Sequence, residues 1–250
     1  MHNDQIVTLF STQETGGFLK PDLDSTSVIV RDPLAVQARR HISRRLSSGV
    51  WKPGERITIR ALAHELGIST TPVREVLLQL ASIGCLELKQ NTSFSVPAMS
   101  LDAYLETRRL RLILEGEAAA VAAERARDRD IDHLAAIHAR LEVAERNQDV
   151  PACLEYNQAF HLTLAQMSHL STLVTFVETL WLRSGPILNA LFPRVQSWQQ
   201  GIYRHLDVIA GLRAHDAEGT RTAIQSDIIE GGPIIEAVLR SQIDSEEHAP

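Results

Sequence analysis

Cysteine is scarce in this sequence, which has only Cys85 and Cys153 among its 250 residues. Two thiols that lie so far apart do not predict a disulfide, and they favour a reducing cytoplasm over an oxidising compartment. Long apolar runs are absent too, because no stretch approaches the roughly 18 residues that a membrane span needs. The first residues show no basic segment followed by an apolar one, so a cleaved export signal is not expected.

A net positive charge is also lacking, because the chain carries −6 overall. That value by itself argues against a nucleic-acid partner. The charge is uneven, however: nine basic and four acidic residues lie between Leu34 and Ala98, so this segment is +5 and the remainder is −11. A basic module joined to an acidic one is typical of a DNA-binding domain with a separate sensor domain. Chance clustering of charge is the alternative interpretation.

The first 98 residues divide into an arm and a helical module. Residues 1–31 mix Gly, Pro and polar residues without a sustained period, which predicts a flexible arm with at most a short strand at 27–30. Residues 32–98 contain three helical patterns, at 36–46, 59–66 and 72–83, and then two short strands at 86–88 and 94–96. Thr58 is a good N-cap for the second helix, and Thr71 before Pro72 for the third. The short turn Gly67–Thr70 completes the pattern of a winged helix-turn-helix.

Beyond residue 100 the pattern is almost entirely helical. We expect six helices, at 101–125, 130–147, 151–168, 172–191, 196–214 and 216–240. Gly231-Gly232-Pro233 must bend or break the last one, and the acidic tail 241–250 is expected to fray. The predicted fold is therefore mostly α, with an N-terminal winged helix-turn-helix (32–98) and a C-terminal all-α six-helix bundle (101–240).

Polar residues near the second and third helices and at the tip of the hairpin are the candidates for binding DNA. In a helix-turn-helix the start of the third helix enters the major groove, so Arg74 is placed to contact guanine or phosphate. Hydroxyls at that helix N-terminus suit phosphate, and the hairpin tip suits the minor groove. A solvated surface on an ordinary three-helix domain is the alternative. The candidates are Arg60, Ser69, Thr70, Thr71, Arg74, Gln90 and Asn91.

The helical half contains one group of potential metal ligands: Asn157, His161, His205 and Asp227. Asn157 and His161 are four residues apart and therefore lie one above the other on a helix face. His205 and Asp227 each lie eleven residues from Asp216, which places them at the same level, about 16 Å from the predicted turn. Two imidazoles and two oxygen ligands suit Zn²⁺, Ni²⁺ or Mn²⁺. The alternative is a metal-free polar pocket that binds an effector directly.

Arg111 is the candidate anchor for the carboxylate group of an effector, because a guanidinium pairs with carboxylates through its planar fork. A surface salt bridge with Glu115, four residues later, is the alternative. The remaining histidines of this half lack partners at informative spacings and are expected at the surface: His133, His138, His169 and His215. Three aromatic residues are expected in the core or the wall of a pocket: Trp181, Trp198 and Tyr203.

Three runs in the first half resemble the GntR family of bacterial regulators: Trp51–Ile57 (WKPGERI), Leu62–Ser69 (LAHELGIS) and Thr71–Leu77 (TPVREVL). The resemblance covers about residues 34–99. It implies operator contacts by the residues that match Arg60, Ser69, Thr70 and Arg74, and minor-groove contacts by those that match Gln90 and Asn91. Thr70 stands where Arg is common, and Asn91-Thr92 where the wing often has Gly, so the operator sequence is left open.

Residues 101–240 resemble the FCD ligand-binding domain of the FadR subfamily, through Arg111-x-x-Leu114-Glu115 and the Ala-rich stretch after it. Six expected helices indicate the shorter, VanR-like branch. Many such domains hold a metal by an Asp and a His on one helix and by a His on each of two later helices. This sequence matches at His161 and His205. It departs at Asn157, where Asp is usual, and at Asp227, where His is usual, so the formal ligand charge is kept and a lower metal affinity is expected.

The resemblance and the residues together predict a cytoplasmic transcriptional regulator, most often a repressor, that binds a near-palindromic DNA operator as a homodimer. A small carboxylate effector is expected in the helical domain, with a divalent metal as the candidate cofactor and no membrane partner. Two alternatives stay open. One is a metal-dependent hydrolase, although no general base or nucleophile motif accompanies the ligands. The other is a DNA-binding protein without an effector.

Overall fold

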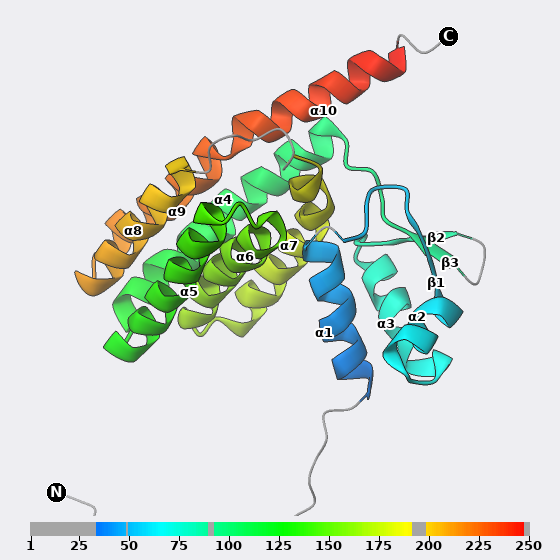
Figure 1. Ribbon diagram of the computed structural model, residues 1–250. Helices are drawn as coiled ribbons and strands as arrows, with labels where there is room; N and C mark the ends of the chain where they lie inside the picture. The colour runs from blue at the N-terminus through cyan, green and yellow to red at the C-terminus, as the bar shows by residue number, and fades with distance from the viewer. Residues whose placement is uncertain (1–33, 49, 90–92, 192–198, 248–250) are drawn as a thin grey trace, which may run out of the picture. The chain divides into compact units, whose positions relative to one another are not determined.

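The computed structural model describes residues 34–48, 50–89, 93–191 and 199–247, all of which belong to the same unit of the chain, 33–250. A small region of helices and strands comes first and is followed by helices alone (Figure 1). The predicted arm, the strand considered at 27–30 and the wing-tip residues Gln90 and Asn91 lie outside the described residues. Within them, no helix is long and apolar enough to cross a membrane.

The N-terminal region has the predicted winged helix-turn-helix architecture. Its elements are α1 (Leu34–Ser47), β1 (Arg56–Thr58), α2 (Ile59–Leu66), α3 (Thr70–Ser82), β2 (Glu87–Lys89) and β3 (Ser93–Ser95). Strand β3 lies between β1 and β2 and pairs antiparallel with both, so that Phe94 stands opposite Ile57 and Leu88. Strand β1 was not predicted, because a three-residue strand has no period of its own and is defined by its pairing with a distant segment.

Local signals set the ends of the helix-turn-helix. The Oγ1 of Thr58 accepts the N–H of Ala61 at 3.3 Å, and Gly67 ends α2 with a left-handed φ of 64°. Helix α3 begins at Thr70, slightly earlier than predicted, with Ser69 at the N-cap. Pro72 is tolerated there because the first N–H groups of a helix have no intrahelical partner. One apolar core joins the three helices and the sheet, and its most buried members include Ile42, Leu46, Leu77, Leu80 and Phe94.

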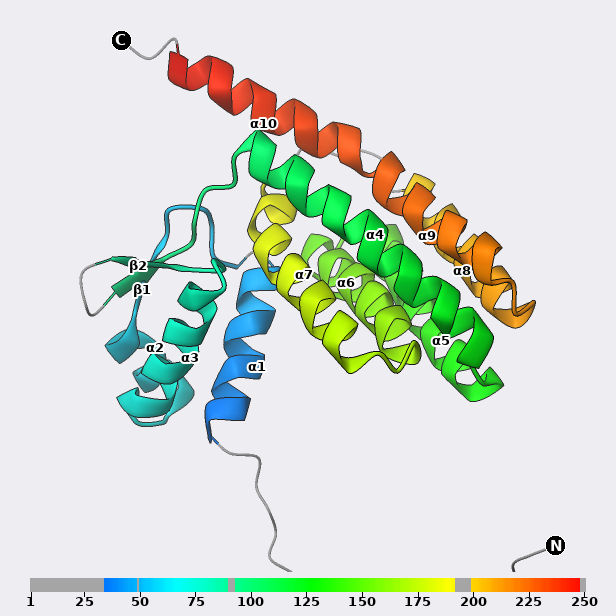
Figure 2. The ribbon, with the colours of Figure 1, turned by 180° about the vertical axis from the view of Figure 1, so that it is seen from behind.

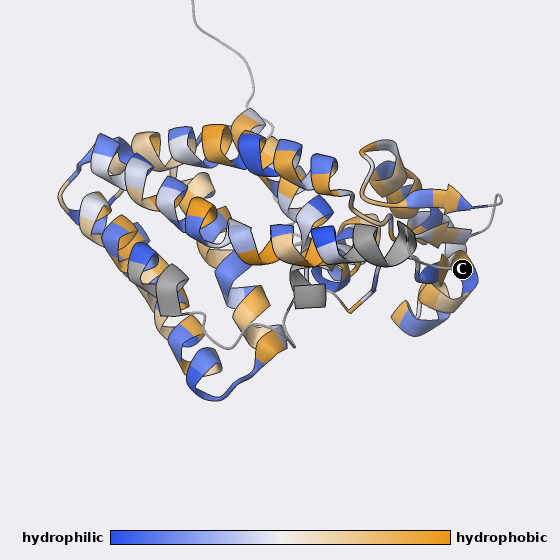
Figure 3. Ribbon diagram, turned by 90° about the horizontal axis from the view of Figure 1, so that it is seen from above, coloured by the Kyte–Doolittle hydropathy of each residue, from blue (hydrophilic) through white to orange (hydrophobic). Residues whose placement is uncertain are grey.

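The C-terminal region contains all six expected helices, with the last one divided at Gly231. Its described segments are α4 (Leu101–Arg125), α5 (Asp128–Arg146), α6 (Val150–Met167), α7 (Ser171–Leu191), α8 (Gln199–Arg213), α9 (Ala217–Glu230) and α10 (Gly232–Glu247). Helix α4 packs against α6, α7, α8 and α9, and Figure 2 shows it across the near side of the bundle. Polar and apolar residues mix along each helix in Figure 3, as expected when one face is buried and another is solvated.

Candidate functional site

A tight helical hairpin brings two of the predicted ligands together. Helix α9 follows α8 after a short turn, and Asp216 caps α9 by accepting the N–H of Gly219 at 2.9 Å. The two helices approach closely at Gly211, which has no side chain: a Cβ there would lie only 2.5 Å from the Oγ1 of Thr220. His205 and Asp227 therefore face each other at the same level, with 3.8 Å between Nε2 and Oδ1. The equal distance of both residues from Asp216 in the sequence predicts this arrangement.

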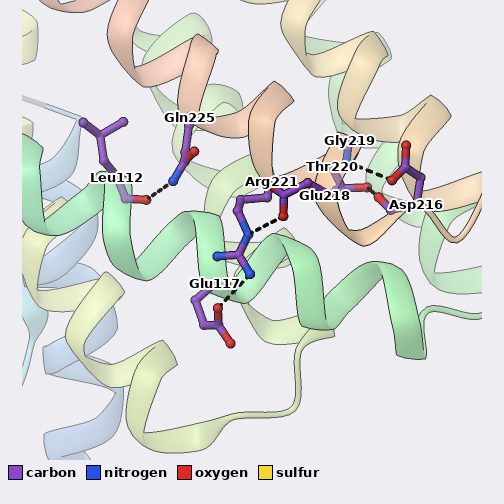
Figure 4. A network of polar contacts seen from close by, with 8 residues as sticks. All are labelled: Leu112, Glu117, Asp216, Glu218, Gly219, Thr220, Arg221 and Gln225. Atoms are coloured by element: carbon purple, nitrogen blue, oxygen red, sulfur yellow. Dashed lines mark hydrogen bonds and ion pairs between the residues drawn. The ribbon is translucent and has the colours of Figure 1, made fainter.

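Polar contacts hold α9 on α4 close to Asp227 (Figure 4). The side-chain amide of Gln225 donates to the backbone oxygen of Leu112 at 3.0 Å. One turn earlier, Arg221 donates to Glu117 at 2.9 Å, in a partly exposed ion pair. These contacts hold α9, which carries Asp227, against α4.

A continuous series of charged side chains runs between α4, α6 and α9. The Nε of Arg111 donates to one oxygen of Glu115 at 2.6 Å, and the other oxygen lies 2.6 Å from the Nδ1 of His161. The Nε2 of His161 lies 3.1 Å from the Asp227 carboxylate. Glu115 and His161 are only 2% and 1% exposed. Buried charges are tolerated when they are paired in this way, so the four residues act as one unit.

The pairing changes how these groups titrate. Burial would raise the pKa of Glu115, but the Arg111 guanidinium and the His161 imidazole outweigh it and lower that pKa to about 2. Burial opposes the charged form of His161 as well, yet the Glu115 and Asp227 carboxylates raise its pKa above the ordinary value. His205 differs, because burial dominates and lowers its pKa to about 3. His205 is therefore a neutral imidazole with a lone pair to offer.

The surroundings of His205 leave its ring nitrogens without partners. Neither nitrogen has a hydrogen bond within the described part of the chain, although the side chain is only 1% exposed. Phe160 stacks on the imidazole, with 3.8 Å between ring centroids, and His138 lies edge-on to it at 5.5 Å. The expectation that His138 lies at the surface is wrong, since it is 3% exposed. It follows Ile131 and Leu134 at helical spacing on the buried face of α5, a signal that the sequence already carried.

The arrangement fits a divalent metal. His161, His205 and Asp227 each offer one ligand atom, and these atoms lie within 4.8 Å of one another. Glu115 holds the Nδ1 of His161, which leaves Nε2 for a metal, and a carboxylate on the second nitrogen is the usual way to orient a ligating imidazole. The buried ring nitrogens of His205, which have no hydrogen bond among the described residues, would be satisfied if one of them bound a metal. Three protein ligands leave room for an oxygen from water or an effector.

The other two predicted site residues are not among these three ligands. Asn157 is half-buried one turn before His161 on α6, and its side chain has no hydrogen bond among the described residues. Arg111 pairs with Glu115, as the alternative interpretation had it. The pair is buried rather than at the surface, because this face of α4 is covered by neighbouring helices of the bundle, and the Arg111 side chain is only 11% exposed. Its guanidinium carbon lies 4.0 Å over the ring of Trp181.

The candidate DNA-binding residues within the described part lie at the starts of α2 and α3. All of them are exposed: Arg60, Ser69, Thr70, Thr71 and Arg74. Neither Arg60 nor Arg74 takes part in an ion pair or a hydrogen bond with another described residue, which leaves both guanidinium groups accessible to a ligand. The first turn of α3 therefore presents hydroxyl groups and a cation on one exposed end.

Comparisons with known proteins establish the family. Residues 34–96 match the bacterial regulatory proteins of the gntR family, and residues 106–229 match the FCD domain. The transcriptional regulator McbR of Escherichia coli K12 is 33% identical over 190 residues, which cover 75% of this chain and 86% of McbR. The chain belongs to the GntR family. The presence of an FCD domain is consistent with the FadR subfamily of that family.

Further relatives and solved structures agree with this assignment. The Glc operon transcriptional activator of Escherichia coli K12 is 28% identical over 189 residues, covering 67% of this chain and 72% of that protein. The solved structure of Escherichia coli McbR superposes with a TM-score of 0.78 at 30% identity, over 85% of this chain and all of the other. These proteins are transcriptional regulators. The GntR/FCD chain described here is accordingly a DNA-binding transcriptional regulator and not an enzyme.

The buried carboxylate of Glu115 can be tested by substitution. We expect Glu115→Gln to lower the free energy of unfolding by about 3 kcal/mol at neutral pH, because the charges of Arg111 and His161 remain buried without their anion. The pKa of this carboxyl is lowered from 4.5 to about 2. Its contribution is therefore complete above about pH 5 and is lost as the pH falls toward 2. Urea unfolding of both proteins across this pH range measures the difference.

Glu117→Gln is the matched control, since it removes a carboxylate from the same helix in a pair that is 49% exposed on the Glu117 side. Exposed pairs of this kind contribute less than about 1 kcal/mol. Equal losses for the two variants at neutral pH would contradict the role given to Glu115, and so would a difference that does not shrink in acid.

Proposed function

We propose that this GntR/FCD regulator is a cytoplasmic repressor that binds a near-palindromic operator as a homodimer and responds to a small carboxylate through a divalent metal. The observation that carries the sensing half is the buried group of His161, His205 and Asp227, with the first imidazole oriented by Glu115. Buried polar atoms usually have hydrogen bonds, and the ring nitrogens of His205, which have none among the described residues, lie beside two other ligand groups that could share a metal with it.

The DNA-binding half of the proposal rests on the first turn of α3. In a helix-turn-helix this turn enters the major groove, and Arg74 is exposed there with its guanidinium accessible. Thr70 and Thr71 would bind phosphate beside it, where helix N–H groups favour anions. Arg60 at the start of α2 would reach the same backbone. Two-fold symmetry in a homodimer would place two such helices in successive major grooves, which is why the operator is expected to be near-palindromic.

The metal-binding half of the proposal assigns each ligand from the chemistry of its side chain. His161 and His205 would supply imidazole nitrogens, Asp227 a carboxylate oxygen and Asn157 an amide oxygen, a mixture suited to Zn²⁺, Ni²⁺ or Mn²⁺. When bound, the metal supplies an electrophilic contact for a carboxylate oxygen of the effector. Arg111 lies near, and only its Nε donates to a protein group among the described residues. Its terminal N–H groups would pair with the remaining oxygens of the effector.

Substitution of Arg74 tests DNA reading. We expect Arg74→Ala to weaken binding to a duplex that the wild-type protein selects from random DNA by about 10- to 100-fold, because a bidentate contact to guanine contributes roughly 1–3 kcal/mol. Fluorescence anisotropy at fixed salt measures the affinity. Arg129→Ala is the charge-matched control, since its side chain is 74% exposed on α5 in the FCD domain. If both variants bind like the wild type, the assignment of Arg74 is wrong.

Substitution of Asn157 tests the metal site. We expect Asn157→Asp to raise the affinity for Zn²⁺ by about tenfold, because an anionic oxygen replaces a neutral one as ligand. Gln158→Glu adds the same charge at the next position of α6 and should change the affinity little. His205→Ala should reduce it by more than about 100-fold, the upper end of what loss of a supporting residue costs. Isothermal titration calorimetry measures all three. Unaltered Zn²⁺ binding in His205→Ala would rule out this site.

A further inference from the structure

Helix α7 contacts two different parts of the molecule within one turn. At Trp181 it meets the site, where the indole ring lies 4.9 Å from the ring of His161 and 4.0 Å from the guanidinium carbon of Arg111. At Gly185 it meets the end of α1, in the region that matches the gntR family. A Cβ on Gly185 would lie 2.5 Å from the Cα of Ser47. The same face of α7 therefore touches both, because residues four apart lie one above the other.

The contact between α7 and α1 is one of backbone against backbone. The neighbours of Gly185 are the Cα of Ser47 and the carbonyl oxygen of Leu46, 2.8 Å from the position of a Cβ, and backbone atoms cannot turn aside as a flexible side chain can. Leu182 adds to the contact, since it is 7% exposed and packs in the same apolar core as Leu46 and Trp51. A movement of α7 at this point would displace the end of α1 directly.

The turn that joins the two contacts also lacks one of the hydrogen bonds of a regular helix. Pro186 lies inside the helix and has no N–H, so the carbonyl oxygen of Leu182 lacks its usual helical partner. The hydroxyl of Ser184 donates back to the carbonyl oxygen of Leu180 at 2.9 Å, a side-chain bond that often accompanies a bend. Helices change direction at such positions. This turn is therefore the place where α7 can alter its course at small energetic cost.

Trp181 is held by packing rather than by a hydrogen bond. Its Nε1 is buried and has no acceptor among the described residues, so its position depends on the side chains that face the ring. Arg111 and His161 are two of them, and Glu115 joins both. Any rearrangement of His161 when a metal binds would thus alter the packing of Trp181 and, one turn later, of Gly185.

We infer that α7 transmits the occupancy of the His161–His205–Asp227 site to the DNA-binding region through the contact of Gly185 with α1. Helix α1 packs on α3, whose first turn carries Arg74. A ligand that favours one position of α7 would therefore favour one orientation of α3 and shift the population that fits DNA. This inference rests on the proposed metal-dependent function, since it takes metal occupancy as the signal.

Hydrogen exchange of the full-length protein tests the inference without any variant. Zn²⁺ is added at a concentration that calorimetry shows to be saturating. We expect slower exchange in α6, α8 and α9, and a change in the last turn of α1 and in residues 180–187, while α2 stays as it was. Bound Zn²⁺ that alters only α6, α8 and α9 overturns the transmission and leaves the metal site standing. Absence of Zn²⁺ binding in the calorimeter overturns the metal site and the transmission together.

Gly185→Ala tests the contact itself. The added methyl group should weaken the coupling between the metal site and DNA binding. For the wild-type protein, the Kd for the operator should change by about fivefold or more on addition of Zn²⁺. For Gly185→Ala the same Kd should change by less than about twofold, while the affinity for Zn²⁺ stays unchanged. Gly231→Ala is the matched control, because Gly231 is helical with a φ of −73° and its Cβ would meet one atom at an ordinary 3.5 Å. A wild-type response to Zn²⁺ in Gly185→Ala overturns the inference. If that variant does not fold, the exchange experiment decides.

Discussion

The ion pairing of the buried Glu115 carboxylate is the interaction on which the site in the FCD domain depends. The Glu115 side chain is only 2% exposed, so its negative charge needs cations beside it. The Nε of Arg111 and the Nδ1 of His161 each lie 2.6 Å from one of its oxygens. The pairing fixes which nitrogen of His161 faces Asp227 and His205. It also holds Arg111 against the ring of Trp181. One carboxylate thus sets both the orientation of His161, a proposed metal ligand, and the packing of the helix that reaches α1.

Most of the fold could be predicted because its signals are local. Helical periodicity, the cap at Thr58 and the Gly67 turn defined the helix-turn-helix, and Gly231 divided the last helix as its neighbours Gly232 and Pro233 required. Strand β1 could not be found in this way. Ile57 is its one apolar residue, and the strand exists because its backbone pairs with β3 far along the chain.

The candidate site was predictable in part for the same reason. Counting residues from the turn at Asp216 places His205 opposite Asp227, because one helical hairpin determines their relation. The roles of Arg111 and Glu115 depend on which face of α4 the other helices cover, and that is set by contacts with several of them. A salt bridge at i and i+4 has the same sequence pattern on a surface as in a core. Only the packing distinguishes the two, and here it buries the pair beside His161, the proposed metal ligand.

A crystal structure of the protein grown with Zn²⁺, with the ion located by anomalous scattering, tests the central claim most directly. We predict an ion about 2.0–2.2 Å from the Nε2 of His161, a nitrogen of His205 and an oxygen of Asp227, while Glu115 keeps its hydrogen bond to the Nδ1 of His161. An ion bound directly by Glu115, or bound away from these three residues, would contradict the account.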